Sequence, residues 1–217
     1  MINLDKEEVR VFRKLNTYKK IQKFLDELPI NFEEGGETCM SPRRVLREGK
    51  AHCIEGAIFA AAVLKFHGEK PLIVDMESNS FDYDHVICVF EKEGSWGAIS
   101  KTNHGVLRFR EPVYRDIREL IMSYFHEYLD SKGRKNLRSY SMPVNLDMFG
   151  SQDWITSEED VWFIPEHLCE VKHFPLVNRR QVANFISPHE IELAVGKLVE
   201  WEDPLKREEE ISFRKIV

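Results

Sequence analysis

The chain lacks long hydrophobic runs, and it shows no sign of a signal for secretion. Its longest uninterrupted apolar run, residues 57–64, is far shorter than the roughly 20 residues that a membrane-spanning helix needs. The first residues, Met1 to Lys20, contain no hydrophobic region of the secretory type. We therefore expect a cytoplasmic protein that has no membrane partner.

Excess charge of one sign and paired metal-ligand motifs are also missing. The 31 Lys and Arg residues oppose 37 Asp and Glu, and a net charge of -6 predicts no nucleic-acid partner. The 4 cysteines are too few for the disulfide framework of a small secreted domain, so we expect free thiols. Because the sequence contains no CxxC or HxxxH pair, we expect no metal site, and no pattern indicates another cofactor.

What the chain does have is the material for one sizeable core, since 42% of its residues are hydrophobic. Apolar spacing and capping residues predict helices over 6–28, 43–47 and 53–68, then from Pro112 to just before Gly133, and from Pro188 to about Trp201. Short β-branched or aromatic runs predict strands at 72–74, 86–90 and 96–99, the last two as an antiparallel hairpin, and a further strand at 107–109. These elements indicate an α+β fold.

We expect residues 1–133 to form the core, with N-terminal helices packed on an antiparallel sheet. Residues 134–177 show no regular pattern, and we expect 134–217 to form a mixed extension on that core, not an independent domain. The aromatic stretch 154–163 either lines a cleft or packs the extension onto the core. The basic run 101–118 is more simply a salt-bridged surface than an anion site, and the tail 202–215 a solvated end.

Cys53 is the most informative residue, because it stands in the first turn of a helix predicted to be buried. Backbone N–H groups and the positive end of the helix dipole stabilise a thiolate at that position. A cysteine nucleophile also needs a base within hydrogen-bond reach, and His85, at the start of a core strand, is the best candidate. Cys88 lies on the opposite strand face and is interpreted as core, whereas Cys39 and Cys169 have no recognisable partner.

The order of these elements resembles the transglutaminase-like superfamily of papain-like folds, over about residues 10 to 105. Before the nucleophile, Cys53, the chain has the family's short helix, Ser41 to Leu46, and its glycine, Gly49. After it come a helix of small residues with a terminal glycine (Ala57, Ala61, Leu64 and Gly68), a strand with the histidine, His85, and a strand with a tryptophan, Trp96. The resemblance implies a papain-like core in which Cys53 and His85 are catalytic.

The third catalytic residue departs from the family's pattern. The family usually carries an aspartate four residues beyond the tryptophan, and this chain has Ser100 there. Ser100 is the first candidate by register, and Asn103 is the second by chemistry, because asparagine orients the histidine in Cys-His-Asn sites. Asp82 or Asp84 could also reach His85 from the preceding loop. The backbone N–H of Cys53 would contribute to the oxyanion hole.

These observations predict attack by Cys53 on an amide or acyl carbonyl, with His85 as acid and base. Peptides, proteins or small amides are the expected substrates, and the resemblance favours hydrolysis over acyl transfer. The alternative is a catalytically silent binding or scaffold module, because a serine cannot supply the negative charge of the usual aspartate. The sequence does not indicate an oligomeric state.

Overall fold

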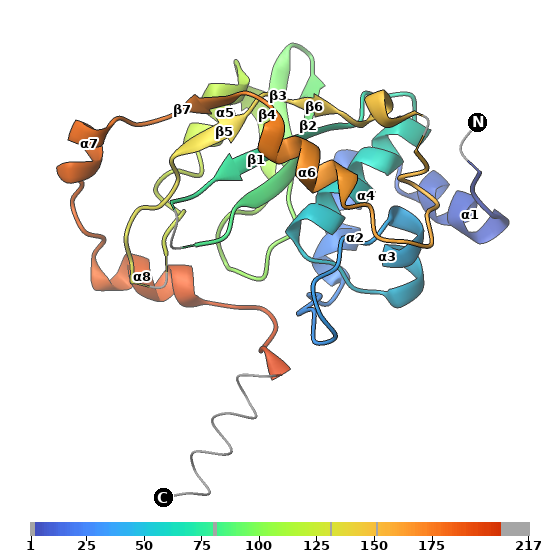
Figure 1. The fold of residues 1–217 in the computed structure, drawn as a ribbon, viewed down its shortest axis with the longest axis horizontal. Coiled ribbons are helices and arrows are strands. Elements are labelled where there is room, and N and C mark those ends of the chain that lie inside the picture. Colours follow the sequence, from blue (N-terminus) through green and yellow to red (C-terminus); the bar gives the residue numbers. More distant parts are fainter. Residues whose placement is uncertain (1–2, 80–81, 131, 151, 205–217) are drawn as a thin grey trace, which may run out of the picture.

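Figure 1 shows the computed structural model, which describes residues 3–79, 82–130, 132–150 and 152–204. Its helices are α1 (Lys6–Lys14), α2 (Tyr18–Glu27), α3 (Pro42–Glu48), α4 (Cys53–Phe66), α5 (Ile117–Met122), α6 (Phe163–Glu170), α7 (Arg179–Ala183), α8 (Glu190–Lys197) and the 3-10 helix η1 (Leu146–Phe149). Its strands are β1 (Leu72–Glu77), β2 (His85–Lys92), β3 (Ser95–Ile99), β4 (Arg110–Tyr114), β5 (Ser139–Ser141), β6 (Val144–Asn145) and β7 (His173–Pro175). The predicted α+β class is confirmed.

The strands form one antiparallel sheet in the order β4-β3-β2-β1-β5-β7, with β6 also paired to β1. The expected hairpin is present as β2 and β3. Its turn places Glu93 and Gly94 in the left-handed region, which matches the twist of a two-residue hairpin connection. The register sets Met76 opposite His85, so the first residue of β2 lies beside the end of β1.

Alternate residues of β2 belong to hydrophobic cores on opposite faces of the sheet. Val86 and Cys88 pack in the core that contains α4, whereas Ile87 and Val89 pack with residues of and after α5. Helix α4 is buried from Ile54 to Leu64, as its lack of a polar face predicts. Figure 1 shows α1 to α4 gathered together at one side of the sheet. A buried helix and a central strand thus hold Cys53 and His85.

The predicted helix over 6–28 is wrong in its continuity, because the structure divides it into α1 and α2. Thr17 is the reason: its side chain accepts a hydrogen bond from the Lys20 backbone N–H at 3.2 Å and begins a new helix. The two shorter helices still bury the predicted apolar residues, among them Phe12, Ile21 and Leu25. The helices predicted near 43–47 and 53–68 are confirmed.

The elements expected at 107–109 and from Pro112 to Gly133 are also wrong in their boundaries. Residues 110–114 form β4, which pairs on one side only, so the missing N–H of Pro112 is tolerated. Helix α5 begins after Asp116, whose carboxylate accepts from the Glu119 backbone N–H at 2.8 Å, and it ends at Met122. The apolar residues that follow continue as turns against the sheet.

The extension from residue 134 is more regular than its pattern suggested, since β5, β6, α6 and β7 lie within it. Its strands join the sheet formed by the earlier residues. Trp154 is 3% exposed and lies in the hydrophobic core around α4, so this part of the aromatic stretch packs the extension against the rest of the molecule. The last helix begins after His189, which forms a capping box with Glu192. Of the predicted tail, residues 205–215 lie outside the described residues.

Bilayer crossing needs a helix that is both long and apolar. Within the described ranges, none of the helices meets these two conditions.

Candidate functional site

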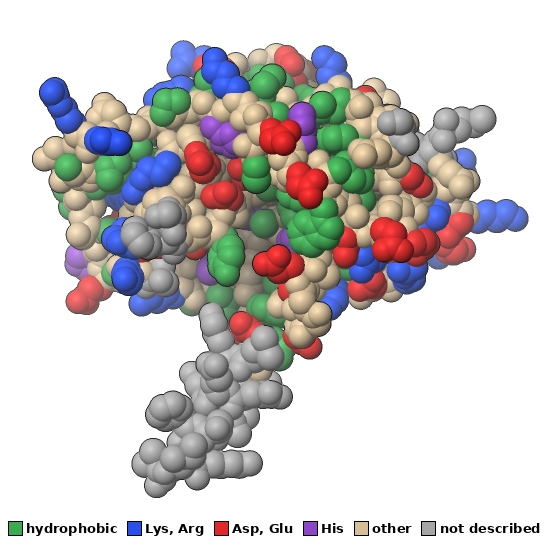
Figure 2. All heavy atoms as spheres, viewed as in Figure 1, with side chains coloured by type: hydrophobic (Ala, Val, Ile, Leu, Met, Phe, Trp, Pro, Cys, Tyr) green, Lys and Arg blue, Asp and Glu red, His purple; other side chains and the backbone are tan. Residues whose placement is uncertain are grey.

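Cys53 is the first residue of α4 and is half-buried. Gly49 ends α3 in the left-handed conformation at φ 65°, and a short loop then leads into α4. The thiol therefore lies beside the free backbone N–H groups of a helix whose remaining turns are fixed in the core. Figure 2 shows the face of the molecule that is turned to the viewer in Figure 1; it is hollowed near its centre and carries acidic side chains around the hollow.

His85 and Ser100 lie within hydrogen-bond distance of each other. The Nε2 atom of His85 lies 2.9 Å from the Ser100 hydroxyl oxygen, and that hydroxyl donates to the Leu107 carbonyl at 2.6 Å. Because the one hydroxyl proton goes to Leu107, Ser100 must accept from His85, which places the imidazole proton on Nε2. Nδ1 is then the nitrogen left to receive a proton from a nucleophile.

Ser100 is itself held by a residue that sequence reasoning missed, Gln22 of α2. The Gln22 amide accepts from the Ser100 backbone N–H at 2.9 Å and donates to its carbonyl at 2.8 Å. Both residues are buried, so the orientation of Ser100 is set by α2 as well as by β3. No local pattern around Gln22 signals this contact, because it joins positions 78 residues apart.

The other candidates for the third residue lie elsewhere. The Asn103 side chain pairs with the backbone of Trp201 through two hydrogen bonds, at 2.9 and 2.8 Å. The Asp84 carboxylate accepts from the Ser78 backbone N–H, and that of Asp82 accepts from Asn136. The structure thus brings Ser100 to His85 and does not bring Asn103 there.

A second histidine, His52, also contacts the thiol. Burial opposes ionisation of Cys53, but hydrogen bonds from His52 and His85 and their positive charge hold the pKa of the thiol well below its usual value. His52 is not among the residues expected from the sequence, because neighbours on a helix point in different directions. In the structure His52 precedes the helix as its N-cap, with extended backbone. The N-cap position was the available signal.

The remaining cysteines have the opposite character. Burial raises the pKa of Cys39 and of Cys88, and it also raises that of the more exposed Cys169. Cys88 is fully buried, as its strand position predicted, and all four thiols are free. The lowered pKa therefore distinguishes Cys53 from every other cysteine of the chain.

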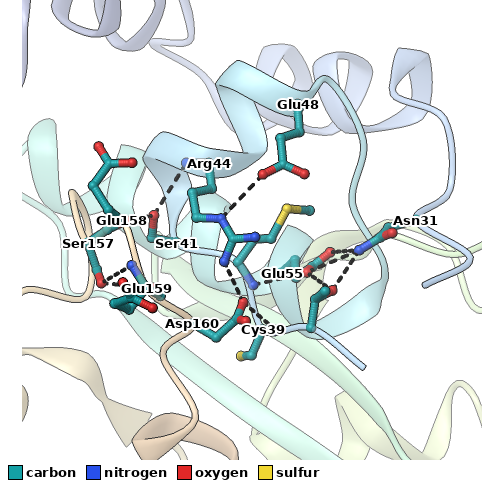
Figure 3. Close-up of polar contacts among 12 residues, drawn as sticks. Asn31, Cys39, Ser41, Arg44, Glu48, Glu55, Ser157, Glu158, Glu159 and Asp160 are labelled. Atoms are coloured by element: carbon teal, nitrogen blue, oxygen red, sulfur yellow. Dashed lines mark hydrogen bonds and ion pairs between the residues drawn. The ribbon is translucent and has the colours of Figure 1, made fainter. Parts of the chain in front are cut away.

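Glu55 organises the loop in front of the site, as Figure 3 shows. Its fully buried carboxylate accepts from the Asn31 amide, from the Thr38 hydroxyl at 2.8 Å, from the Met40 backbone N–H at 3.0 Å and from the His52 backbone N–H at 2.9 Å. These bonds fasten the loop 31–40 to the first turn of α4. Rigid support of this kind is what a catalytic side chain needs.

The same loop is fastened on its other side to the segment before α6. Asp160 accepts from the Cys39 backbone N–H at 3.0 Å and from the Arg44 guanidinium at 2.6 Å (Figure 3). Ser41 donates to the Ser157 carbonyl at 2.6 Å. The loop that supports His52 is therefore held between the N-terminal half of the chain and the extension.

An acidic residue of β1, Asp75, lies within electrostatic range of Cys53. Burial, together with the nearby Asp84, raises the pKa of Asp75 to about 7. Its carboxylate lies 3.3 Å from Nε2 of His173, whose Nδ1 lies 2.9 Å from the Val171 carbonyl. Because the carbonyl requires a proton on Nδ1, the contact between Nε2 and the carboxylate requires one further proton, which the two groups share.

The basic run 101–118 is largely ion-paired, as expected. Arg108 bonds to Glu200 at 2.9 Å and Arg110 to Glu127 at 2.6 Å, while Lys101 is buried and donates to the Leu25 carbonyl at 2.8 Å. Among the residues that the structure describes, no cluster of His, Cys, Asp and Glu has a metal-binding arrangement.

No family model matches the chain, and no match to it was found among curated proteins.

Proposed function

We propose that the chain is a cysteine-nucleophile hydrolase with a papain-like core of the transglutaminase-like type, acting on amides of peptides, proteins or small molecules. The observation that carries this proposal is the position of Cys53. Its thiol has a lowered pKa, lies at a helix N-terminus and is hydrogen-bonded to His85, whose tautomer is fixed by Ser100. The free thiols fit a reducing compartment such as the cytoplasm.

In the proposed reaction the Cys53 thiolate attacks the carbonyl carbon of the amide. As the C–N bond breaks, protonated His85 gives its Nδ1 proton to the leaving amine, and a thioester forms. Neutral His85 then takes a proton from water, whose oxygen attacks the thioester and releases the acid and the thiolate. The backbone N–H of Cys53 would stabilise the oxyanion in both halves.

Ser100 fits this reaction as a positioning residue. Its hydroxyl accepts from His85 Nε2 and so presents Nδ1 to the thiol, which is one task of the usual aspartate. A carboxylate at position 100 would face the Leu107 carbonyl oxygen, which lies 2.6 Å from the serine oxygen, and two acceptors would repel each other. A hydroxyl, which can both donate to Leu107 and accept from His85, therefore fits position 100 better than a carboxylate.

The decisive experiment measures alkylation of Cys53 by iodoacetamide as a function of pH, with mass spectrometry of the modified peptides. Cys169 is more exposed and its pKa is raised, so it supplies an internal reference in the same sample. We expect Cys53 to react with a pKa well below ~8.5, the value of an ordinary thiol.

Turnover is then tested with p-nitrophenyl acetate, an activated acyl ester. Wild-type protein should form an acetyl thioester at Cys53 and release it, whereas Cys53→Ala should do neither while keeping the thermal stability of the fold. If Cys53 alkylates no faster than Cys169 at neutral pH and forms no thioester, the proposal is wrong and a silent binding module is the better account.

A further inference from the structure

We propose that His52 carries the fixed positive charge that keeps Cys53 ionised, and that His85 serves only to move protons to and from the substrate. The inference rests on the proposed function and deepens it. It divides between two histidines the two tasks that one histidine and an aspartate perform in the usual site.

The first argument comes from the partners of each imidazole. His85 has a neutral hydroxyl on its Nε2, so the partner of that nitrogen supplies no counter-charge to the ring. The Nε2 atom of His52 lies 2.9 Å from the Thr38 carbonyl, 3.4 Å from the Glu55 carboxylate and 3.5 Å from that of Glu33. A carbonyl and two carboxylates around an N–H favour the imidazolium.

The second argument comes from the direction of the His52 ring. Because Nε2 donates to Thr38, Nδ1 is the ring nitrogen that faces the first turn of α4, where Cys53 lies. A protonated Nδ1 beside the sulfur forms a thiolate–imidazolium pair that is buried on one side and needs no substrate to assemble. In agreement, the hydrogen bond to Cys53 and the charge of Glu55 raise the pKa of His52 to about 9, against the opposing effect of burial.

Other titratable groups face the thiol, and they do not replace His52. Asp75 of β1 is negatively charged when it is ionised. It then disfavours the Cys53 thiolate by like-charge repulsion and cannot stabilise it. Tyr128, after α5, donates its hydroxyl to the carbonyls of Met76 and Tyr83. Cys39 lies in the loop 31–40, and the Cys53 charge is one of the influences that keep it protonated. The described positive charges at the sulfur therefore come from the two histidines.

The proton balance follows directly. His52 keeps both ring protons throughout the cycle and only stabilises the sulfur while it is negative. The Cys53 thiol gives its proton to Nδ1 of His85 as it ionises, His85 passes that proton to the leaving amine in acylation, and it takes one from water in deacylation. Departure of the thiolate from the tetrahedral intermediate is then assisted by a cation that is already in place. A serine at position 100 is sufficient, because the charge of His52 stabilises the thiolate whichever protonation state His85 has.

The test compares three variants by the pH profile of Cys53 alkylation and of thiolate ultraviolet absorbance. His52→Gln should move the thiol pKa up toward ~8.5, which lowers the alkylation rate at pH 6 about tenfold for each unit by which the new pKa exceeds 6. His85→Asn should keep most of the low thiol pKa but stop release of the acetyl group from Cys53. Glu33→Gln should raise the thiol pKa by a smaller amount.

Glu33→Gln keeps the test decisive if His52→Gln fails to fold. Glutamine preserves the carbonyl that accepts from the Thr38 backbone N–H at 2.7 Å, so the loop is retained and one negative charge is lost. Glu34→Gln is the matched control, since Glu34 is the exposed neighbour on the same loop, and it should leave the profile unchanged.

The possible failures are distinguishable. If His85→Asn alone raises the thiol pKa, or if both histidine variants raise it equally, the division of tasks is refuted while the proposed hydrolase stands. If the thiol of the wild-type protein has an ordinary pKa, the proposed function itself fails. Unchanged profiles in both His52→Gln and Glu33→Gln also overturn the inference.

Discussion

Replacing Ser100 by alanine should damage both the stability and the chemistry of the site. The substitution removes the acceptor of the His85 Nε2 proton at 2.9 Å and the donor to the Leu107 carbonyl at 2.6 Å. Each neutral hydrogen bond contributes about 1 kcal/mol net, and the groups left buried without partners add to the cost. We expect a loss of about 2 kcal/mol in the free energy of unfolding.

For a chain of this size, 2 kcal/mol lowers the melting temperature by about 4–8 °C. The effect on catalysis is a separate quantity. Without the serine the imidazole is free to carry its proton on Nδ1, the tautomer that cannot accept from a nucleophile. If the loss of this orientation raises the activation free energy by about 1–2 kcal/mol, acetyl release from Cys53 slows about 5- to 30-fold, since 1.36 kcal/mol is a factor of ten in rate.

Ser123→Ala is the matched control. Ser123 is half-buried, and its hydroxyl also makes two bonds, to the Leu120 carbonyl at 2.6 Å and from the Arg110 guanidinium at 2.9 Å. It should lose comparable stability, measured by thermal unfolding, and keep the wild-type rate of acetyl release. A Ser100→Ala protein with the wild-type rate would show that this bond does not orient His85, and the reasoning would be refuted.

Three further predictions concern stability, each measured by urea unfolding. A Cβ on Gly56 would lie 2.4 Å from Cβ of Lys101, so Gly56→Ala should cost about 2 kcal/mol despite alanine's helix preference, whereas Gly35→Ala, with open space around it, should cost almost nothing. Glu55→Gln should cost about 3 kcal/mol, because an amide N–H2 would face buried donors, and an unchanged urea midpoint would contradict this. Asp75 has its pKa raised to about 7 in the folded state, from 3.8, so the folded state binds the proton longer and stability should fall as pH rises between these values. Asp75→Asn should flatten that part of the pH profile, and an equally steep profile in the variant would exclude Asp75 as its cause.

The elements that local patterns predicted well are those whose determinants lie within a few residues. Ser41, Pro42 and Gly49 begin and end α3 by caps that need no distant partner, and the apolar run of α4 demands burial wherever it packs. The hairpin of β2 and β3 follows from a short turn between two β-branched runs. Cys53 was found for the same reason, since a helix start is a local feature.

The elements predicted wrongly depended on distant contacts. Residues 110–114 have helical spacing, but they form backbone hydrogen bonds with the edge of β3 and become a strand. Pro112 is tolerated there because this strand lies at the edge of the sheet. Residues 139–141 and 173–175 are short segments that form strands because β1 provides a template for β5 and β5 provides one for β7. Pairing energy of this kind is invisible in a window of neighbouring residues.

The chain by itself determined that a thiol stands at a helix start and that a histidine follows at the head of a core strand. Only the tertiary structure decided which group completes the site, because that choice depends on directions in space. Position 100 and position 103 are three residues apart, yet one hydroxyl points at His85 and the amide turns to Trp201. In the same way, His52 joins the thiol through a loop that Glu55 anchors from the buried side of α4.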